Sequence, residues 1–165
     1  MNRINLLIVT FFGIGKIKFA PGTCASFVTI IILFSLFNWF FLNPVVILIV
    51  VISLFFYSFI AIKNTLKEFK NDDPQEIVID EFLGQSIPVI LYEFAHGPTT
   101  LSFDKVVPYF FMFLAFRMFD IFKPFPINYF DKKFKNNFGI IMDDIMAGIY
   151  TVILLVLLMI FNSSI

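Results

Sequence analysis

The chain has 165 residues, of which 59% are hydrophobic and 15% are charged, and its formal net charge is zero. Soluble domains carry about 25% charged residues, so this composition predicts a polytopic membrane protein, and the length predicts a single domain over residues 1–165. The zero net charge gives no electrostatic basis for binding nucleic acid. Because Cys24 and His96 are the only residues of their types, an internal disulfide and metal sites built from several Cys or His ligands are excluded.

Five apolar segments predict membrane-spanning helices, and thus an all-α bundle. They cover residues 23–42, 45–62, 77–94, 106–122 and 145–161. A transmembrane helix needs about 20 apolar residues, so the run at 4–12 is too short to cross the bilayer. Pro21 and Gly22 follow this run and break regular structure before the first span. We expect the N-terminal segment to lie at the membrane interface or to enter the bilayer without crossing it.

The distribution of charge predicts the orientation of the bundle. If the spans alternate in direction, one side of the membrane receives the N-terminus and the loops at 63–81 and 117–144. That side holds 11 of the 12 basic residues, whereas the other side holds Lys105 alone. The positive-inside rule therefore places the first side in the cytoplasm. The same arrangement brings acidic residues from three separate segments to the cytoplasmic face.

Asp80 and Glu81 lie several residues inside the third apolar segment. Charged groups at such positions are costly to keep in a membrane and usually have a function. Glu76, Asp80 and Gly84 are four residues apart, so they share one face if this region is helical. Gly84 leaves room on that face for a neighbouring backbone or a ligand. For Glu76, the alternative is a solvated helix N-terminus, where acidic residues suit the helix dipole.

Arg117, Asp120 and Lys123 occupy successive turns at the end of the fourth apolar segment. They have two interpretations. In the first, they form structural ion pairs whose long side chains reach the membrane interface. In the second, Arg117 binds phosphate oxygens through its planar guanidinium group, Asp120 binds a metal ion and Lys123 adds a second positive charge. The prolines at 124 and 126 end the helix after Lys123.

Asp143 and Asp144 stand together at the start of the last apolar segment. Adjacent carboxylates at this position either cap a helix or repel each other unless a cation lies between them. Oxygen ligands without His or Cys favour Mg²⁺ over zinc. Thr23, in the turn before the first span, either caps that helix or belongs to an anion-binding turn.

These residues together predict phosphoryl chemistry at a lipid surface. A carboxylate would attack the phosphate or activate water, and cations would neutralise the phosphate charge. The candidate catalytic and Mg²⁺-binding residues are Asp80, Glu81, Asp120, Asp143 and Asp144. The candidate phosphate-binding residues are Arg117, Lys123 and Thr23.

Several short motifs follow one another along nearly the whole chain. They are Ala20-Pro21-Gly22-Thr23, Ile77-Val78-Ile79-Asp80-Glu81 with Gly84, Phe116-Arg117 with Phe119-Asp120-Ile121, Lys123-Pro124 with Pro126-Ile127, Asp131, and Gly139 with Met142-Asp143-Asp144 and Ala147-Gly148. In these motifs the chain resembles the phosphatidylglycerophosphatase A family. It departs from the family pattern at Lys18, Ala25 and Asn128, where proline, glycine and a basic residue are usual.

The resemblance implies a Mg²⁺-dependent phosphatase of the bacterial inner membrane, with its active site facing the cytoplasm. Its substrate would be the phospholipid phosphatidylglycerophosphate, and its products would be phosphatidylglycerol and phosphate. The acidic motifs of the family correspond to the five acidic residues named above, with Arg117 and Lys123 as basic partners. The sequence is also compatible with assembly into a homo-oligomer.

A cation transporter or channel with a carboxylate-lined path is the alternative from a different functional class. A transporter needs acidic groups near the middle of the bilayer and exit groups on both faces. Here the acidic residues gather on one predicted face, which favours the enzyme. A CDP-alcohol transferase is less favoured, because its spaced Asp-Gly, Ala-Arg, Gly, Asp and Asp motif is absent from the chain.

Overall fold

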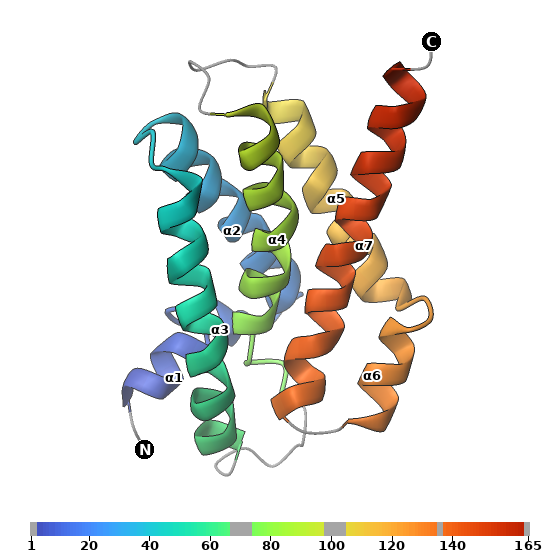
Figure 1. Cartoon of the computed structure of the whole chain (residues 1–165). Helices are drawn as coiled ribbons and strands as arrows, with labels where there is room; N and C mark the ends of the chain where they lie inside the picture. The colour runs from blue at the N-terminus through green and yellow to red at the C-terminus, as the bar shows by residue number, and fades with distance from the viewer. Residues whose placement is uncertain (1–2, 67–73, 98–104, 135–136, 164–165) are drawn as a thin grey trace.

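The computed structural model describes residues 3–66, 74–97, 105–134 and 137–163, and the regular structure in these ranges is entirely helical (Figure 1). The helices are α1 (Arg3–Val9), the short 3-10 helix η1 (Ile14–Lys16), α2 (Pro21–Asn38), α3 (Pro44–Leu66), α4 (Ile79–His96), α5 (Val106–Phe122), α6 (Ile127–Lys133) and α7 (Asn137–Ser163). The predicted all-α class is therefore confirmed. Much of the predicted loops at 63–76 and 95–105 lies outside the described residues, as do Lys135 and the side chains of Asp131 and Lys132.

Helix α4 occupies the centre of the bundle and packs against α2, α3, α5 and α7 (Figure 1). Its pairing with α7 is the most extensive. Pro88 lies inside α4 without ending it, because the surrounding helices enclose that turn. Such enclosure by neighbouring helices is what allows proline within membrane helices.

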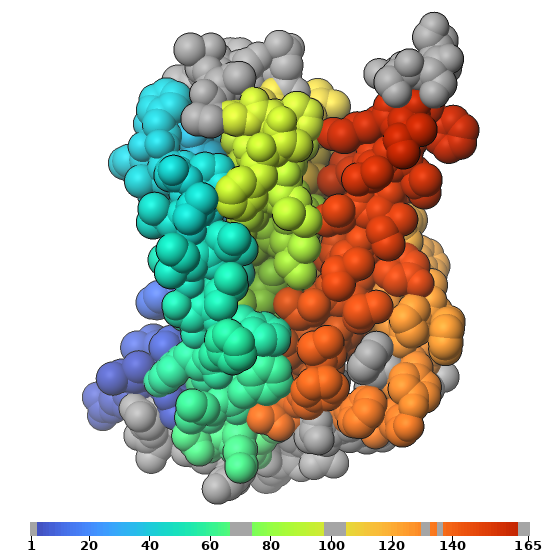
Figure 2. Space-filling model, in the orientation of Figure 1, coloured from blue at the N-terminus to red at the C-terminus, as the bar shows by residue number. Residues whose placement is uncertain are grey.

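Three helices, α2, α3 and α7, are long and apolar enough to cross a membrane. Their outer surfaces carry exposed aliphatic and aromatic side chains, as expected for contact with lipid. Figure 2 shows α3 and α7 on the viewed face of the molecule, with part of α4 between them. Helix α5 has only 17 residues. Helix α4 has 18, but it includes Asp80, Glu81 and Glu93. All five predicted spans thus correspond to long helices, and three of them have the length and hydropathy of a span.

Two of the differences between the predicted and observed helix boundaries affect the acidic residues. Helix α7 begins at Asn137, well before the predicted start at 145, so Asp143 and Asp144 lie inside the helix and do not cap it. The Asn137 amide is held by a hydrogen bond of 3.0 Å to the Phe59 carbonyl of α3. Helix α4 begins at Ile79, so Glu76 lies in the preceding turn and does not share a helical face with Asp80.

The short α1 is attached to the bundle at the end where α4 begins. The Tyr57 hydroxyl of α3 donates a hydrogen bond of 2.7 Å to Asn5 Oδ1. The backbone N–H of Val78 donates to the Val9 carbonyl at 2.9 Å. With seven residues, α1 is too short to span a bilayer, in agreement with the prediction.

A buried charged network joins α4 and α5 at the opposite end of the bundle. Lys105 Nζ lies 3.1 and 3.0 Å from the two carboxylate oxygens of Glu93. The Tyr109 hydroxyl donates a further hydrogen bond of 2.9 Å to Glu93 Oε1. Because both charged groups are almost fully buried, removing one of them leaves the other buried without an opposite charge.

We therefore expect Lys105→Met to destabilise the protein by about 3–5 kcal/mol, the usual effect of breaking a buried ion pair. The measurement is chemical unfolding of the purified protein in detergent. Lys63→Met is the control, because Lys63 is exposed near the end of α3. The double variant Lys105→Met with Glu93→Gln should recover part of the loss. A Lys105→Met protein as stable as the control would contradict the assignment.

Candidate active site

Three of the five predicted acidic residues meet where α4 and α7 pack together. One carboxylate oxygen from each of Asp80, Glu81 and Asp144 lies within 4.8 Å of the other two. Asp80 and Asp144 are 9% and 3% exposed. Asp80 Oδ1 and Glu81 Oε2 are buried and have no hydrogen-bond partner among the described residues. Buried carboxylates at this spacing repel each other, and a hard divalent cation is the ligand that would neutralise them.

Two glycines allow α4 and α7 to approach at this level. A Cβ atom on Gly84 would overlap the backbone carbonyl of Asp144, with its carbon at 2.8 Å. A Cβ atom on Gly148 would overlap the backbone carbonyl of Gly84. Of the two alternatives predicted for the space at Gly84, a neighbouring backbone or a ligand, the structure shows the backbone, in the segment that carries Asp144.

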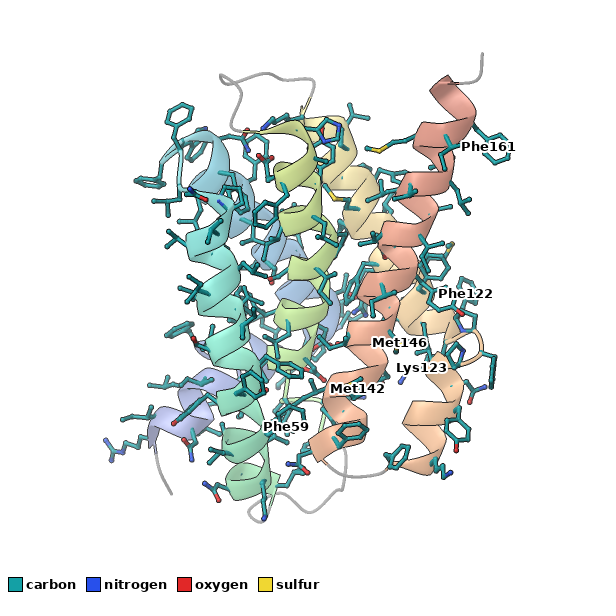
Figure 3. All side chains as sticks on the ribbon, viewed as in Figure 1. Phe59, Phe122, Lys123, Met142, Met146 and Phe161 are labelled. Carbon is teal, nitrogen blue, oxygen red and sulfur yellow. The ribbon has the colours of Figure 1, made fainter. Side chains whose placement is uncertain are left out.

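The other two predicted acids are held by the predicted basic residues. Arg117 Nη1 lies 2.6 Å from Asp120 Oδ2, one turn away on α5. Lys123 Nζ lies 2.8 Å from Asp143 Oδ2 and so links the end of α5 to α7. Figure 3 shows Lys123 beside α7, near Met142 and Met146. Asp120 and Asp143 thus lie outside the three-carboxylate group, and they position the side chains of Arg117 and Lys123 beside it.

The acidic members of these two ion pairs also lie close enough to the three carboxylates to repel them. Asp120 interacts with Glu81 and Asp144, and Asp143 interacts with Asp80. The structure therefore brings all five acidic residues into one region, with Arg117 and Lys123 at its edge. This arrangement provides oxygen ligands for a cation and positive charge for an anion.

The N-terminus of α2 forms another wall of the region. A Cβ atom on Gly22 would overlap the Glu81 carboxylate and would lie 3.5 Å from Arg117 Nη1. Arg117 Nη1 also lies 3.5 Å from Ser26 Oγ, which in turn donates to the Gly22 carbonyl at 3.0 Å. The segment predicted as a turn before the first span is thus mostly the first turn of α2, which begins at Pro21, and it lies next to the acidic residues.

At the N-terminus of α2, residues other than Thr23 contact the acidic and basic residues of the site. Thr23 is half-buried, and its hydroxyl has no hydrogen-bond partner among the described residues. Gly22 and Ser26 make the contacts to Glu81 and Arg117 instead. Their spacing of four residues places them on one helical face and is the sequence signal that identifies them. The phosphate-binding role of Thr23 stays a prediction.

Apolar helices enclose a group of carboxylates toward one end of the bundle, and two basic residues lie beside this group. These features define a membrane-associated protein of the kind that processes phosphate groups. The chain belongs to the phosphatidylglycerophosphatase A family, whose sequence profile matches residues 7–159. No solved structure matches the chain.

Curated relatives support this membership. The chain is 38% identical over 156 residues to phosphatidylglycerophosphatase A of Haemophilus influenzae, covering 93% of this chain and 86% of the relative. It is 32% identical over 150 residues to the Escherichia coli K12 protein of the same name, covering 90% and 78%. A Bacteroides thetaiotaomicron relative, provisionally named phosphatidylinositol-3-phosphatase, is 33% identical over 156 residues, covering 92% and 91%. The family is thus one of phosphatases.

The glycine contact gives a direct test of the site geometry. We expect Gly84→Ala to separate α4 from α7 and to destabilise the protein by about 1–3 kcal/mol, the range for overpacking in a protein interior. Phosphatase activity should fall by more than tenfold, because the carboxylates of the two helices move apart. Both are measured on purified protein, by thermal unfolding and by phosphate release.

Ala95→Val is the matched control, because it adds methyl groups to the same helix at an exposed position. It should leave both quantities near wild type. If Gly84→Ala behaved like this control, the close contact between the two backbones would be refuted.

Proposed function

We propose that the protein is a Mg²⁺-dependent phosphatase that converts phosphatidylglycerophosphate to phosphatidylglycerol and phosphate. The observation that supports this most directly is the grouping of Asp80, Glu81 and Asp144 within 4.8 Å beside two basic residues. Membership in the phosphatidylglycerophosphatase A family supports the choice of substrate. A transporter is not favoured, because the grouped acids lie together toward one end of the bundle. Toward the other end, the described residues Glu93 and Lys105 pair with each other.

The donor set fits Mg²⁺. Asp80, Glu81 and Asp144 would hold the ion, since each offers a carboxylate oxygen and two of these residues have buried oxygens without a hydrogen-bond partner among the described residues. The bound ion would supply electrostatic stabilisation of the charge on the phosphoryl group. Burial of Asp80 and Asp144 lowers the local dielectric constant and strengthens this interaction.

Arg117 and Lys123 would bind the non-bridging oxygens of the terminal phosphate. The planar guanidinium group of Arg117 suits two parallel hydrogen bonds to such a group. Asp120 holds Arg117 in place at 2.6 Å, and Asp143 holds Lys123 at 2.8 Å. Both cations are therefore positioned before the substrate arrives, which lowers the entropic cost of binding. A carboxylate of the site would accept the proton of a water molecule that attacks phosphorus, while the P–O bond to the glycerol breaks and the glycerol oxygen leaves with a proton as the hydroxyl of phosphatidylglycerol. In the alternative, a carboxylate attacks phosphorus with loss of the same glycerol oxygen, and water then hydrolyses the acyl phosphate to free phosphate.

For the membrane arrangement, we propose five spans, formed by α2, α3, α4, α5 and α7, in the bacterial inner membrane. The strong excess of basic residues in the N-terminus and in the loops at 63–81 and 117–144 supports a cytoplasmic position for the site. The acyl chains of the substrate would lie against exposed apolar faces of the helices while the headgroup enters the site.

A second candidate substrate is a phosphorylated inositol lipid. The observation in its favour is the provisional name of the Bacteroides thetaiotaomicron relative. The family description and the two other relatives favour phosphatidylglycerophosphate. Both lipids are phosphate monoesters on a polyol headgroup, so the same carboxylates and cations serve either one.

The activity is tested by phosphate release from phosphatidylglycerophosphate and from phosphatidylinositol 3-phosphate, each with Mg²⁺ or with EDTA. We expect Mg²⁺-dependent release, with the higher kcat/KM for the first lipid. Asp80→Asn and Asp144→Asn should each lower kcat/KM by at least 100-fold, whereas Glu76→Gln, an acid outside the group, should retain activity. Full activity in both Asn variants would refute the site assignment.

The same variants report on the metal site without relying on activity. In EDTA, Asp80→Asn and Asp144→Asn should melt at higher temperatures than wild type, because a neutral amide removes carboxylate repulsion. Mg²⁺ should stabilise wild type and have little effect on the variants. Absence of Mg²⁺-dependent phosphate release together with cation flux into protein-containing liposomes would instead favour a transporter.

The orientation is tested by labelling a single cysteine. In a Cys24→Ser background, Lys133→Cys places a thiol at the exposed end of α6. We expect a membrane-impermeant maleimide to label it only after the cells are permeabilised. Labelling of intact cells from outside would overturn the cytoplasmic assignment.

A further inference from the structure

Gln85 is a buried polar residue with unused hydrogen-bonding groups. It lies on α4, one turn after Glu81, and its side chain is 0% exposed. Neither its Oε1 nor its Nε2 has a hydrogen-bond partner among the described residues. Most buried polar groups in proteins are paired, and leaving them unpaired is unfavourable. An amide with both ends unpaired among the described residues therefore calls for a further partner, which a bound ligand can provide.

The position of Gln85 connects it to the candidate active site. A spacing of four residues places it on the same helical face as Glu81. That face is directed toward Gly22 and Arg117, since a Cβ atom on Gly22 would touch both Glu81 and Arg117. Arg117 Nε and Glu81 Oε2 are likewise buried without a hydrogen-bond partner. Unpaired groups from α4 and α5 thus gather around the same region, where Asp80 and Asp144 are also buried.

The chemistry of the amide limits what its partner can be. Gln85 offers one acceptor oxygen and one donor nitrogen. A phosphate dianion only accepts hydrogen bonds, and a cation binds only the oxygen, so neither satisfies both ends. A hydroxyl group both donates and accepts. In phosphatidylglycerophosphate, one free hydroxyl lies on the glycerol that separates the two phosphates.

The depth of Gln85 in the bundle agrees with this partner. One helical turn corresponds to about 5.4 Å, so Gln85 lies that much farther along α4 than Glu81, away from the helix end. With the terminal phosphate at the carboxylates and the acyl chains in the bilayer, the glycerol is the next group of the substrate in this direction. We propose that the Gln85 amide binds the glycerol hydroxyl and makes Gln85 a specificity-determining residue. This inference rests on the phosphatase function proposed above.

The test compares phosphatidylglycerophosphate with an analogue whose glycerol hydroxyl is replaced by hydrogen. Wild type should hydrolyse the analogue with a kcat/KM about tenfold lower, as expected for the loss of one buried hydrogen bond. Gln85→Met has nearly the same size and no amide. This variant should have the same kcat/KM for both lipids, equal to that of wild type with the analogue. The lower kcat/KM for the natural lipid should come mainly from a higher KM.

Thermal unfolding separates this role from a structural one. Gln85→Met should melt at the same temperature as wild type or higher, because it removes an unpaired buried amide. Ser86→Ala is the matched control. Ser86 is also buried on α4, but its hydroxyl donates to the Phe82 carbonyl at 2.6 Å. This variant should keep the tenfold preference for the natural lipid.

Each other outcome overturns the proposal. If Gln85→Met keeps the preference, or lowers kcat/KM for both lipids equally, Gln85 does not bind the hydroxyl. If wild type hydrolyses both lipids equally, the inference fails while the phosphatase function stands. If wild type releases no phosphate from either lipid, the proposed function fails and the inference fails with it.

Discussion

The contact between the backbones of α4 and α7 is the constraint on which the site depends. Gly84 and Gly148 lack the side chains that would keep the helices apart. Asp80 precedes Gly84 by one turn, and Asp144 precedes Gly148 by one turn. The helix packing therefore also sets the distance between the carboxylates of the two helices. Their mutual repulsion opposes this packing, so the protein keeps the acids together only because the surrounding helices pack well.

Among the described residues, buried charges are fully paired at one end of the bundle and only partly paired at the other. At one end, Glu93 and Lys105 form a closed pair with Tyr109, and both carboxylate oxygens of Glu93 are used. At the other end, acidic side chains outnumber the basic residues that contact them, and several buried oxygens have no hydrogen-bond partner among the described residues. The first arrangement is complete without a ligand. The second is typical of functional sites, where local stability is given up for binding or catalysis.

The sequence predicts the helices and the convergence of the acids well. Long apolar runs can satisfy their backbone groups in a membrane only as helices, and alternating spans bring Asp80, Asp120 and Asp144 to one end. Helix boundaries in polar segments depend on tertiary contacts, such as that of Asn137 with Phe59, so the early start of α7 could not be predicted. The sequence also does not show that three of the acids form a cation-compatible group while the other two form ion pairs. Residue spacing alone does not identify the partner of a side chain.

The sequence alone does not identify Gln85 as part of the site. Within an apolar run, one amide looks like a tolerated exception, and its spacing from Glu81 is the only signal that links it to the acids. What identifies it is the combination of full burial with two unpaired atoms, and both properties belong to the folded chain. Buried polar groups without partners are therefore as informative as motifs in finding a site.

The placement of the carboxylates on α4 and α7 has a consequence for biogenesis. Domains and helices emerge from the ribosome in chain order, N-terminal segments first. A nascent chain that has inserted α1 to α5 already holds Asp80, Glu81 and Arg117, but it lacks the third carboxylate, Asp144, which α7 carries. The cation-compatible group is therefore complete only once α7 has joined the bundle. If this group is the catalytic site proposed above, partly synthesised chains that lack α7 would be inactive on lipid.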